Sequence, residues 1–256
     1  MIQLPEKIIA IKEDGHQALF EISPLYPGYG VTLGNALRRT LLSSIEGSAI
    51  TTVKIKGVSH EFSTIDGVME NVIEILMNVK KIRLKSFSDE PVTLQLKAGG
   101  EREVTAKDIK TDSSIEITNK NQHIATLTDK KSELEIEFTV ERGIGYVPVE
   151  QRQKEKISVG TLAIDAIFSP VRNVNFTVEN IRVGQRTDYN KILLEIETDG
   201  TINPKNALIR SVNILLEQLS VVKQALGEES EENISGQETE DSENSKKKSS
   251  KTKKKK

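Results

Sequence analysis

The chain has 256 residues, and its 36 Lys and Arg against 38 Asp and Glu give a formal net charge of −2. A protein that binds duplex DNA through its whole surface is basic, and this average is not. The absence of Cys excludes a disulfide framework, a thiolate zinc site and a cysteine nucleophile. No Trp and 4% aromatic residues argue against stacking platforms for single-stranded nucleic acid. Because the longest apolar run, Ile8–Ile11, is so short, we expect neither a membrane span nor a signal peptide.

The first predicted helix runs from Thr32 to Ile45. It carries one apolar stripe with a spacing of four residues, formed by Leu33, Leu37, Leu41 and Ile45. Arg38 and Arg39 lie about 100° apart on such a helix. Both guanidinium groups therefore reach past the edge of the stripe, either as a solvated rim or as donors to a partner's carboxylates or carbonyls.

Four short segments alternate apolar and polar residues, namely 53–56, 92–97, 134–140 and 191–196. This period of two predicts half-buried strands with one polar face, which is typical of antiparallel sheets. We interpret Glu133, Glu135 and Glu137 as that polar face and not as a metal cluster. A second helix is predicted from Asp66 to Ile82. The mixture predicts an α+β fold.

The last predicted helix follows Asn203, a suitable N-cap, and Pro204, which suits a first turn. Its apolar residues recur at spacings of four and three up to the stop at Gly227, and they are Leu208, Val212, Leu215, Leu219, Val222 and Leu226. Such a stripe needs a long partner surface. The chain's own sheet or the same helix of a second copy would serve, and the spacing does not choose between them.

The segment after Gly227 has a different composition. Residues 228–243 contain eight acidic and no basic side chains, and residues 246–256 contain eight lysines and no acidic ones. With Ile234 as its one aliphatic residue, this tail is expected to be disordered. It is either a solvating tail or an arm whose lysines, among them Lys246, Lys247, Lys248 and Lys251, contact nucleic acid or an acidic partner.

Catalytic motifs are scarce. No G-x-x-x-x-G-K-[ST] loop occurs, and Gly28, Gly30 and Gly34 miss the G-x-G-x-x-G spacing by one residue. The three histidines, His16, His60 and His123, are far apart in the sequence and outside any H-E-x-x-H frame. We therefore expect no catalytic residue, metal or cofactor in this chain.

The run Thr32-Leu33-Gly34-Asn35-Ala36-Leu37-Arg38-Arg39 resembles the signature of the alpha subunit of bacterial-type DNA-directed RNA polymerase. Further blocks match that family in order, including His60–Thr64, Glu74–Leu76 with Asn78 and Lys80, Gly145–Pro148, Asp165-Ala166, and Arg182-Val183 with Gln185–Asp188. The resemblance covers about residues 1–227.

The resemblance implies two subdomains. Residues 1–46 and 170–227 would form a dimerisation subdomain of antiparallel sheet and two long helices, and residues 47–169 would form a mostly-β subdomain inserted into it that contacts the large subunits. It also implies a homodimer in which the first and last helices of two copies pack together. The interface would contain Leu33, Leu37, Leu41, Leu208, Val212, Leu215, Leu219 and Val222.

The resemblance further implies a non-catalytic platform on which the beta and beta-prime subunits assemble, with magnesium held by the catalytic subunit. Arg39 matches a family arginine that supports beta-subunit binding, and Lys80, Arg182 and Lys191 match further positions implicated in large-subunit contacts. Bacterial members commonly continue into a small C-terminal domain that binds promoter DNA, whereas only 29 residues follow Gly227 here. The lysine block is a hypothetical, sequence-independent substitute for that domain.

A bacterial cytoplasm is the expected location, ahead of a plastid. The alternative function is a free-standing dimeric scaffold, or a nucleic-acid-binding protein, that uses the same body.

Overall fold

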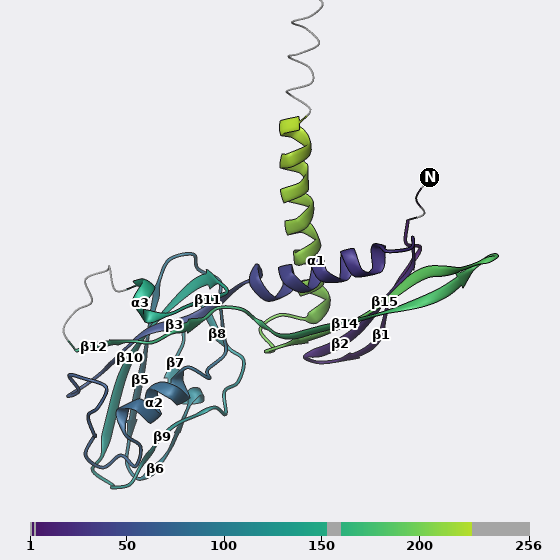
Figure 1. Cartoon of the computed structure of the whole chain (residues 1–256). Coiled ribbons are helices and arrows are strands. Elements are labelled where there is room, and N and C mark those ends of the chain that lie inside the picture. The colour runs from purple at the N-terminus through teal and green to yellow at the C-terminus, as the bar shows by residue number, and fades with distance from the viewer. Residues whose placement is uncertain (1, 3, 153–159, 227–256) are drawn as a thin grey trace, which may run out of the picture. The chain divides into compact units, whose positions relative to one another are not determined.

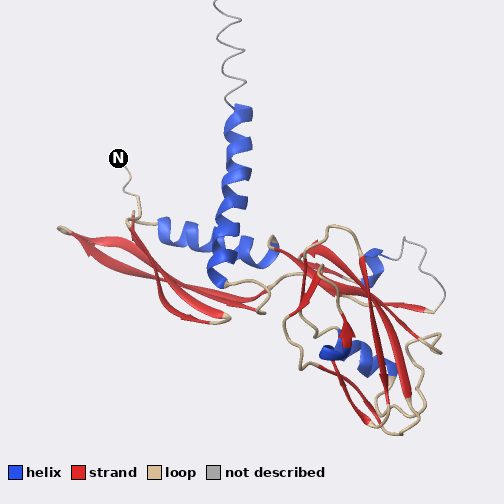
Figure 2. Cartoon of the chain, turned by 180° about the vertical axis from the view of Figure 1, so that it is seen from behind, coloured by secondary structure: helices blue, strands red, loops and turns tan. Residues whose placement is uncertain are grey.

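The computed structural model describes residues 2, 4–152 and 160–226 (Figure 1). The predicted tail, with its lysines 246–248 and 251, lies outside these residues. The chain divides into a first unit, Met1–Ser211, and a second that begins at Val212. Strands predominate in the first unit, and they are joined by a few helices (Figure 2). The α+β prediction is therefore confirmed.

One sheet combines strands from the two ends of the chain. Its four antiparallel strands have the order β1-β2-β15-β14, with bounds β1 Lys7–Asp14, β2 Gln17–Leu25, β15 Arg186–Thr198 and β14 Val171–Val183. Leu194 of β15 lies opposite Phe20 of β2 on one side and Phe176 of β14 on the other. The alternation predicted for 191–196 is confirmed, since Ile192, Leu194 and Ile196 are fully buried.

Helix α1 (Tyr29–Ser43) packs on β14 and β15 of this sheet. It begins three residues before the predicted start, because Gly28 adopts a left-handed conformation (φ 87°) that turns the chain into the helix. The predicted helical segment Thr32–Ile45 is otherwise confirmed to within two residues at its end.

The second sheet comes from the middle of the chain and surrounds the larger core. Its strands follow the order β7-β5-β10-β3-β4-β8, and β12 also pairs with β3. The bounds are β3 Glu46–Ile55, β4 Leu84–Ser86, β5 Val92–Gly99, β7 Ile109–Lys110, β8 Ile115–Ile117, β10 Glu133–Ile144 and β12 Thr161–Ala163. The strands predicted at 92–97 and 134–140 lie in β5 and β10, and the segment predicted at 53–56 lies in β3 except for Lys56, because β3 ends at Ile55. As expected, the glutamates of β10 form a polar face, where Glu135 pairs with Lys56 and Lys97 at 3.1 and 3.2 Å.

Helix α2 (Val72–Val79) covers this core through Val72, Ile75 and Val79, all of them fully buried. The prediction of a helix from Asp66 was wrong for its first turns. Asn71 caps the helix reciprocally with Glu74, and the residues before it lie alongside β9 (His123–Leu127), where Val68 bridges Leu127. A strand-like pairing partner thus replaces the helical hydrogen bonds that the apolar spacing favoured.

Smaller elements complete the first unit. Strand β6 (Arg102–Thr105) pairs with β9, and β11 (Tyr146–Val147) pairs with β13 (Ala166–Ile167). A 3-10 turn η1 (Ala106–Asp108) and a short helix α3 (Val149–Arg152) connect neighbouring strands.

Residues 204–226 form the predicted last helix. The Asn203 side chain accepts a hydrogen bond from the Lys205 backbone N–H at 2.8 Å, which is the expected N-terminal cap. Among the residues that the structure describes, no helix is both long and apolar enough to cross a membrane.

Candidate functional site

Helix α1 is held unusually close to its sheet by two glycines. A Cβ atom on Gly34 would lie 2.5 Å from the ring of Phe176, and one on Gly30 would lie 2.6 Å from Cγ1 of Val178. Real Cβ contacts do not become this short, so only glycine permits the observed approach of α1 to β14. These glycines are packing residues, in agreement with their failure to match a phosphate-binding spacing.

Asn190 of β15 anchors the start of the same helix. Its buried side chain accepts hydrogen bonds from the backbone N–H groups of Gly28 at 2.9 Å and Gly30 at 3.4 Å, and it donates to Asn180 at 3.1 Å. Gly28 supplies no side-chain cap, so a distant strand satisfies the first amides of the helix. Asn190 was not predicted as an anchor of this helix, because nothing in the sequence connects it with Gly28, 162 positions away.

The apolar stripe of α1 is largely covered within one chain. Leu37 and Leu41 are 6% and 0% exposed, and Leu33 is half-buried. A second copy would therefore gain little from direct contact with Leu37 or Leu41. The reason is that Gly30 and Gly34 let α1 approach β14 closely, so that Leu37 and Leu41 are buried within their own chain.

The last helix differs along its length. Ala207, Leu208 and Ser211 are buried in the first unit. In the second unit Leu215 is half-buried, whereas Val212, Leu219 and Val222 are 38%, 64% and 56% exposed. Leu216, Val221 and Leu226 are also exposed. We call the residues Val212, Leu219, Val222 and Leu226 the apolar stripe of the last helix; contiguous exposed apolar surface of this kind marks an interaction site.

Arg39 lies on the exposed side of α1, like its neighbour Arg38. Within the part of the chain that the structure describes, neither guanidinium group forms a hydrogen bond or an ion pair. Both cations are therefore available to an incoming partner.

Lys80, which ends α2, is already engaged. Its ammonium nitrogen lies 2.9 Å from a carboxylate oxygen of Asp165 and 5.8 Å from the ring centre of Tyr146. The hydrogen bond from Lys80 holds the pKa of Asp165 below its ordinary value, and the Asp165 carboxylate in turn raises the pKa of the Tyr146 hydroxyl. A partner at Lys80 would have to share or replace Asp165.

Lys191 and Arg182 extend from the β14–β15 hairpin. Lys191 lies 2.7 Å from the carboxylate of Glu179 on the neighbouring strand, which raises the pKa of the lysine. Arg182 is exposed and donates from Nε to the carbonyl of Gly184 at 3.0 Å. Each of Lys80, Lys191 and Arg182 has its own polar partner within the described part of the chain, and no contact there joins any two of the four predicted cations. They therefore do not form one cluster.

An aromatic group near the start of α1 was not predicted. The guanidinium of Arg186 lies over the rings of Tyr26 and Tyr189, at 5.7 and 5.4 Å from their centres, and Asp188 holds it through two hydrogen bonds. Tyr26 also contacts Tyr29 edge to face. Only four tyrosines occur in the chain, which is the one sequence feature that could have drawn attention to this group.

The described residues offer no metal centre, since no three of their His, Asp or Glu side chains are placed to hold an ion. His60 is exposed, and its Nδ1 atom lies 3.2 Å from the hydroxyl of Ser63.

Known proteins match this chain over most of its length. The family described as the RNA polymerase Rpb3/RpoA insert domain matches residues 53–169, the segment that forms most of the second sheet. The DNA-directed RNA polymerase subunit alpha of Symbiobacterium thermophilum is 48% identical over 238 residues, covering 93% of this chain and 75% of that protein. The chain belongs to the family of DNA-directed RNA polymerase alpha subunits.

Two further family members give the same result. The alpha subunit of Roseiflexus castenholzii is 50% identical over 211 residues, or 82% of this chain and 65% of that protein. The alpha subunit of Clostridium beijerinckii is 46% identical over 224 residues, or 86% of this chain and 71% of that protein. The alpha-subunit family thus confirms the resemblance carried by the block Thr32–Arg39.

Proposed function

We propose that this chain is a non-catalytic alpha subunit that forms a homodimer and serves as the platform on which beta and beta-prime subunits assemble. The enzyme so formed transfers nucleotides, and its magnesium belongs to the catalytic subunit. Membership of the alpha-subunit family carries this proposal. The bacterial source of these relatives favours a bacterial cytoplasm as the place of action.

The proposed dimer interface is the apolar stripe of the last helix. Full burial of an aliphatic side chain contributes about 1.5–3 kcal/mol, so the exposed valines and leucines of residues 212–226 represent a substantial driving force. A second copy offers the same patch and allows an isologous contact. The family resemblance implies that Leu33, which its own chain only half covers, also belongs to the dimer interface.

Arg39 is the strongest candidate for contact with the beta subunit. Long cations bury their stems and form forked hydrogen bonds with a partner's polar atoms. Lys80 and Lys191 already have carboxylate partners in the chain, whereas Arg39 has none among the described residues. Loss of a buried, paired arginine costs about 2–5 kcal/mol of binding.

The first test replaces Arg39 and uses Arg38 as its matched control, since both are exposed arginines on one helix. We expect Arg39→Ala to fold and dimerise but to lose recruitment of the beta subunit, measured by co-purification of tagged subunits. Arg38→Ala should recruit it normally. If Arg39→Ala also loses the dimer, Arg39 belongs to the dimer interface and not to the contact with the beta subunit. If both variants lose recruitment equally, Arg39 has no specific role in that contact.

The second test introduces charge into the apolar stripe of the last helix. The double change Leu219→Asp with Val222→Asp should give a monomer by size-exclusion chromatography with light scattering. Asn213→Asp, an exposed polar position on the same helix, is the control and should leave the dimer intact. A dimer that persists in the double variant would contradict the proposed interface.

Purification from the chain's own cells separates the proposal from the free-standing scaffold. Co-elution with two much larger chains and with polymerase activity supports the alpha-subunit function. An isolated dimer that lacks both would support the alternative.

A further inference from the structure

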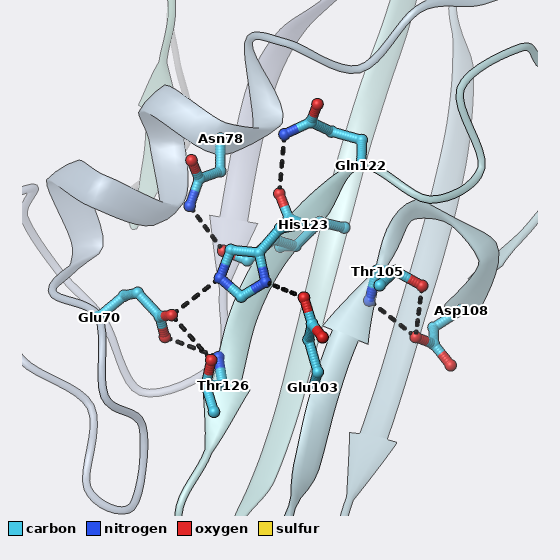
Figure 3. A network of polar contacts seen from close by, with 9 residues as sticks. Glu70, Asn78, Glu103, Thr105, Asp108, Gln122, His123 and Thr126 are labelled. Carbon is cyan, nitrogen blue, oxygen red and sulfur yellow. Dashed lines mark hydrogen bonds and ion pairs between the residues drawn. The ribbon is translucent and has the colours of Figure 1, made fainter.

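His123 lies between two carboxylates that come from different parts of the chain. Its Nε2 atom is 2.9 Å from an oxygen of Glu70, and its Nδ1 atom is 2.8 Å from an oxygen of Glu103 (Figure 3). Glu70 precedes α2, Glu103 belongs to β6, and His123 begins β9. One imidazole therefore connects three segments.

This geometry specifies the protonation state of the ring. A neutral imidazole donates from one nitrogen only, and an ionised carboxylate only accepts. Both contacts exist together only when the ring is an imidazolium that donates from both nitrogens.

The two carboxylates are held differently. Glu70 is 14% exposed and also accepts hydrogen bonds from the backbone N–H and hydroxyl of Thr126, at 2.6 and 3.0 Å. Glu103 is 63% exposed. Loss of the ring proton therefore releases the solvated Glu103 contact most easily, and it weakens the charge-assisted bond to the buried Glu70.

The segment tethered by Glu70 is the one that the helix prediction misplaced. Met69 donates its backbone N–H to the carbonyl of Thr126 at 2.9 Å, and Thr128 donates to the carbonyl of Gly67 at 2.9 Å. Asn71 follows directly and caps α2. The Glu70 side chain is thus the last tether of this segment to β9 before α2 begins.

Other charged groups near the ring are paired elsewhere. Beyond β6, Asp108 is bound to Arg102 at 2.7 Å. On α2, which packs on β9, Glu74 closes the capping box with Asn71, and Lys80 pairs with Asp165. Glu70 and Glu103 are therefore the charges that act on His123 directly.

We propose that protonated His123 is a pH-dependent clamp that fixes the segment Gly67–Asn71 against β9 and so holds the start of α2. Burial opposes the charge on the ring, but the two carboxylates outweigh it and raise the pKa of His123 above 6.5. Below the ordinary histidine pKa of 6.5, His123 is protonated and the clamp is complete. The clamp is lost as the pH rises through the raised pKa of His123. On the acid side, the hydrogen bonds of Glu70 outweigh its burial and lower its pKa below 4.5. The contact between His123 and Glu70 therefore persists as the pH falls, until the pH reaches the lowered pKa of Glu70.

The test is an NMR titration of the full chain combined with amide hydrogen exchange. Imidazole resonances report the pKa of His123, and protection factors of the Met69 and Thr126 amides report the clamp, after correction for intrinsic base-catalysed exchange. We expect protection to fall as His123 titrates, by up to about tenfold for each unit by which its pKa exceeds the ordinary value.

Three variants make the test specific. His123→Gln should lose the pH dependence of protection near neutrality, and Glu103→Gln should lower both the His123 pKa and the pH at which protection falls. His60→Gln, which changes an exposed histidine outside the clamp, should behave as the unmodified chain. Constant protection while His123 titrates, or an unchanged pH dependence in His123→Gln, would overturn the proposal. If His123→Gln does not fold, Glu103→Gln provides the test. A pH dependence of amide protection that does not shift in Glu103→Gln would also overturn the proposal.

Discussion

The seat of α1 on β14 yields the sharpest stability prediction, for the change Gly34→Ala. The added Cβ atom would lie 2.5 Å from Cδ2 and Cε2 of Phe176 and 3.0 Å from Cγ. Ordinary carbon contacts are about 3.5–4.0 Å, so helix and ring must separate by roughly 1 Å. Rotation of the ring does not remove the overlap, because Cγ is also close.

The expected magnitude follows from two opposing effects. Overpacking of this kind costs about 1–3 kcal/mol. Alanine is a better helix former than glycine by about 1 kcal/mol, which offsets part of that loss. We therefore expect Gly34→Ala to lower the free energy of unfolding by up to about 2 kcal/mol, measured by urea unfolding at one fixed protein concentration.

A double-mutant cycle identifies the cause. Phe176→Leu removes ring atoms at the contact, so the combined variant should be more stable than the sum of the single changes by about 1 kcal/mol. Asn35→Ala, at an exposed position on the same helix, should change stability by less than about 0.5 kcal/mol. The reasoning is refuted if Gly34→Ala is more stable than the unmodified chain, as helix propensity alone would make it, or if the cycle is additive.

Three further predictions concern single polar contacts. Asn71→Ala should destabilise the chain by about 1 kcal/mol through loss of the α2 cap, seen in urea unfolding, whereas Asn71→Ser should restore most of it. Asp165→Asn should move the raised pKa of Tyr146 back toward its ordinary value in a spectrophotometric tyrosine titration, and an unmoved pKa would contradict the assigned cause. Glu70→Gln should flatten the dependence of stability on pH on the acid side. In the unmodified chain the Glu70 contribution is complete above 4.5 and is lost as the pH falls through its lowered pKa. Thermal unfolding across that pH range measures the difference, and identical profiles would refute this role.

Local alternation was enough to predict four strand segments, but it did not predict strands such as β1, β2 and β14. It was also unreliable for segments whose partners are distant in the sequence. The alternation in Leu134–Val140 records which side chains enter the core, so it predicts β10 without any knowledge of its neighbours. The apolar residues Val68 and Val72 fit a helix equally well, but Val68 pairs with Leu127 across a loop. The choice between a helix and this pairing depends on Leu127, which is too far along the sequence for a local pattern around Val68 to include.

The candidate site shows the same limit. Arg39 was predicted as a contact residue because it lies within the block Thr32–Arg39, which resembles the family, and this prediction is still to be tested. Which surface covers the last helix could not be told from the sequence, because Leu215 and Leu219 have the same spacing whether the chain's own sheet or a second copy covers them. The close approach of α1 that Gly30 and Gly34 allow was not predicted either, because it depends on β14, more than a hundred residues later. Asn190 was missed for the same reason.

The order of strands in the first sheet also has a consequence for how the chain folds as it is made. All strands of the second sheet are complete by Ala163, whereas β2 must wait for β15, which begins at Arg186. During synthesis the helix α1 therefore leaves the ribosome long before Phe176 and Asn190, the residues that hold it, exist. The strands of the second sheet then have all their partners, whereas β2 has only β1 and still lacks β15. A chain that ends near residue 170, once released from the ribosome, would thus contain every strand of the second sheet but an α1 that lacks β14 and β15, the strands on which it packs.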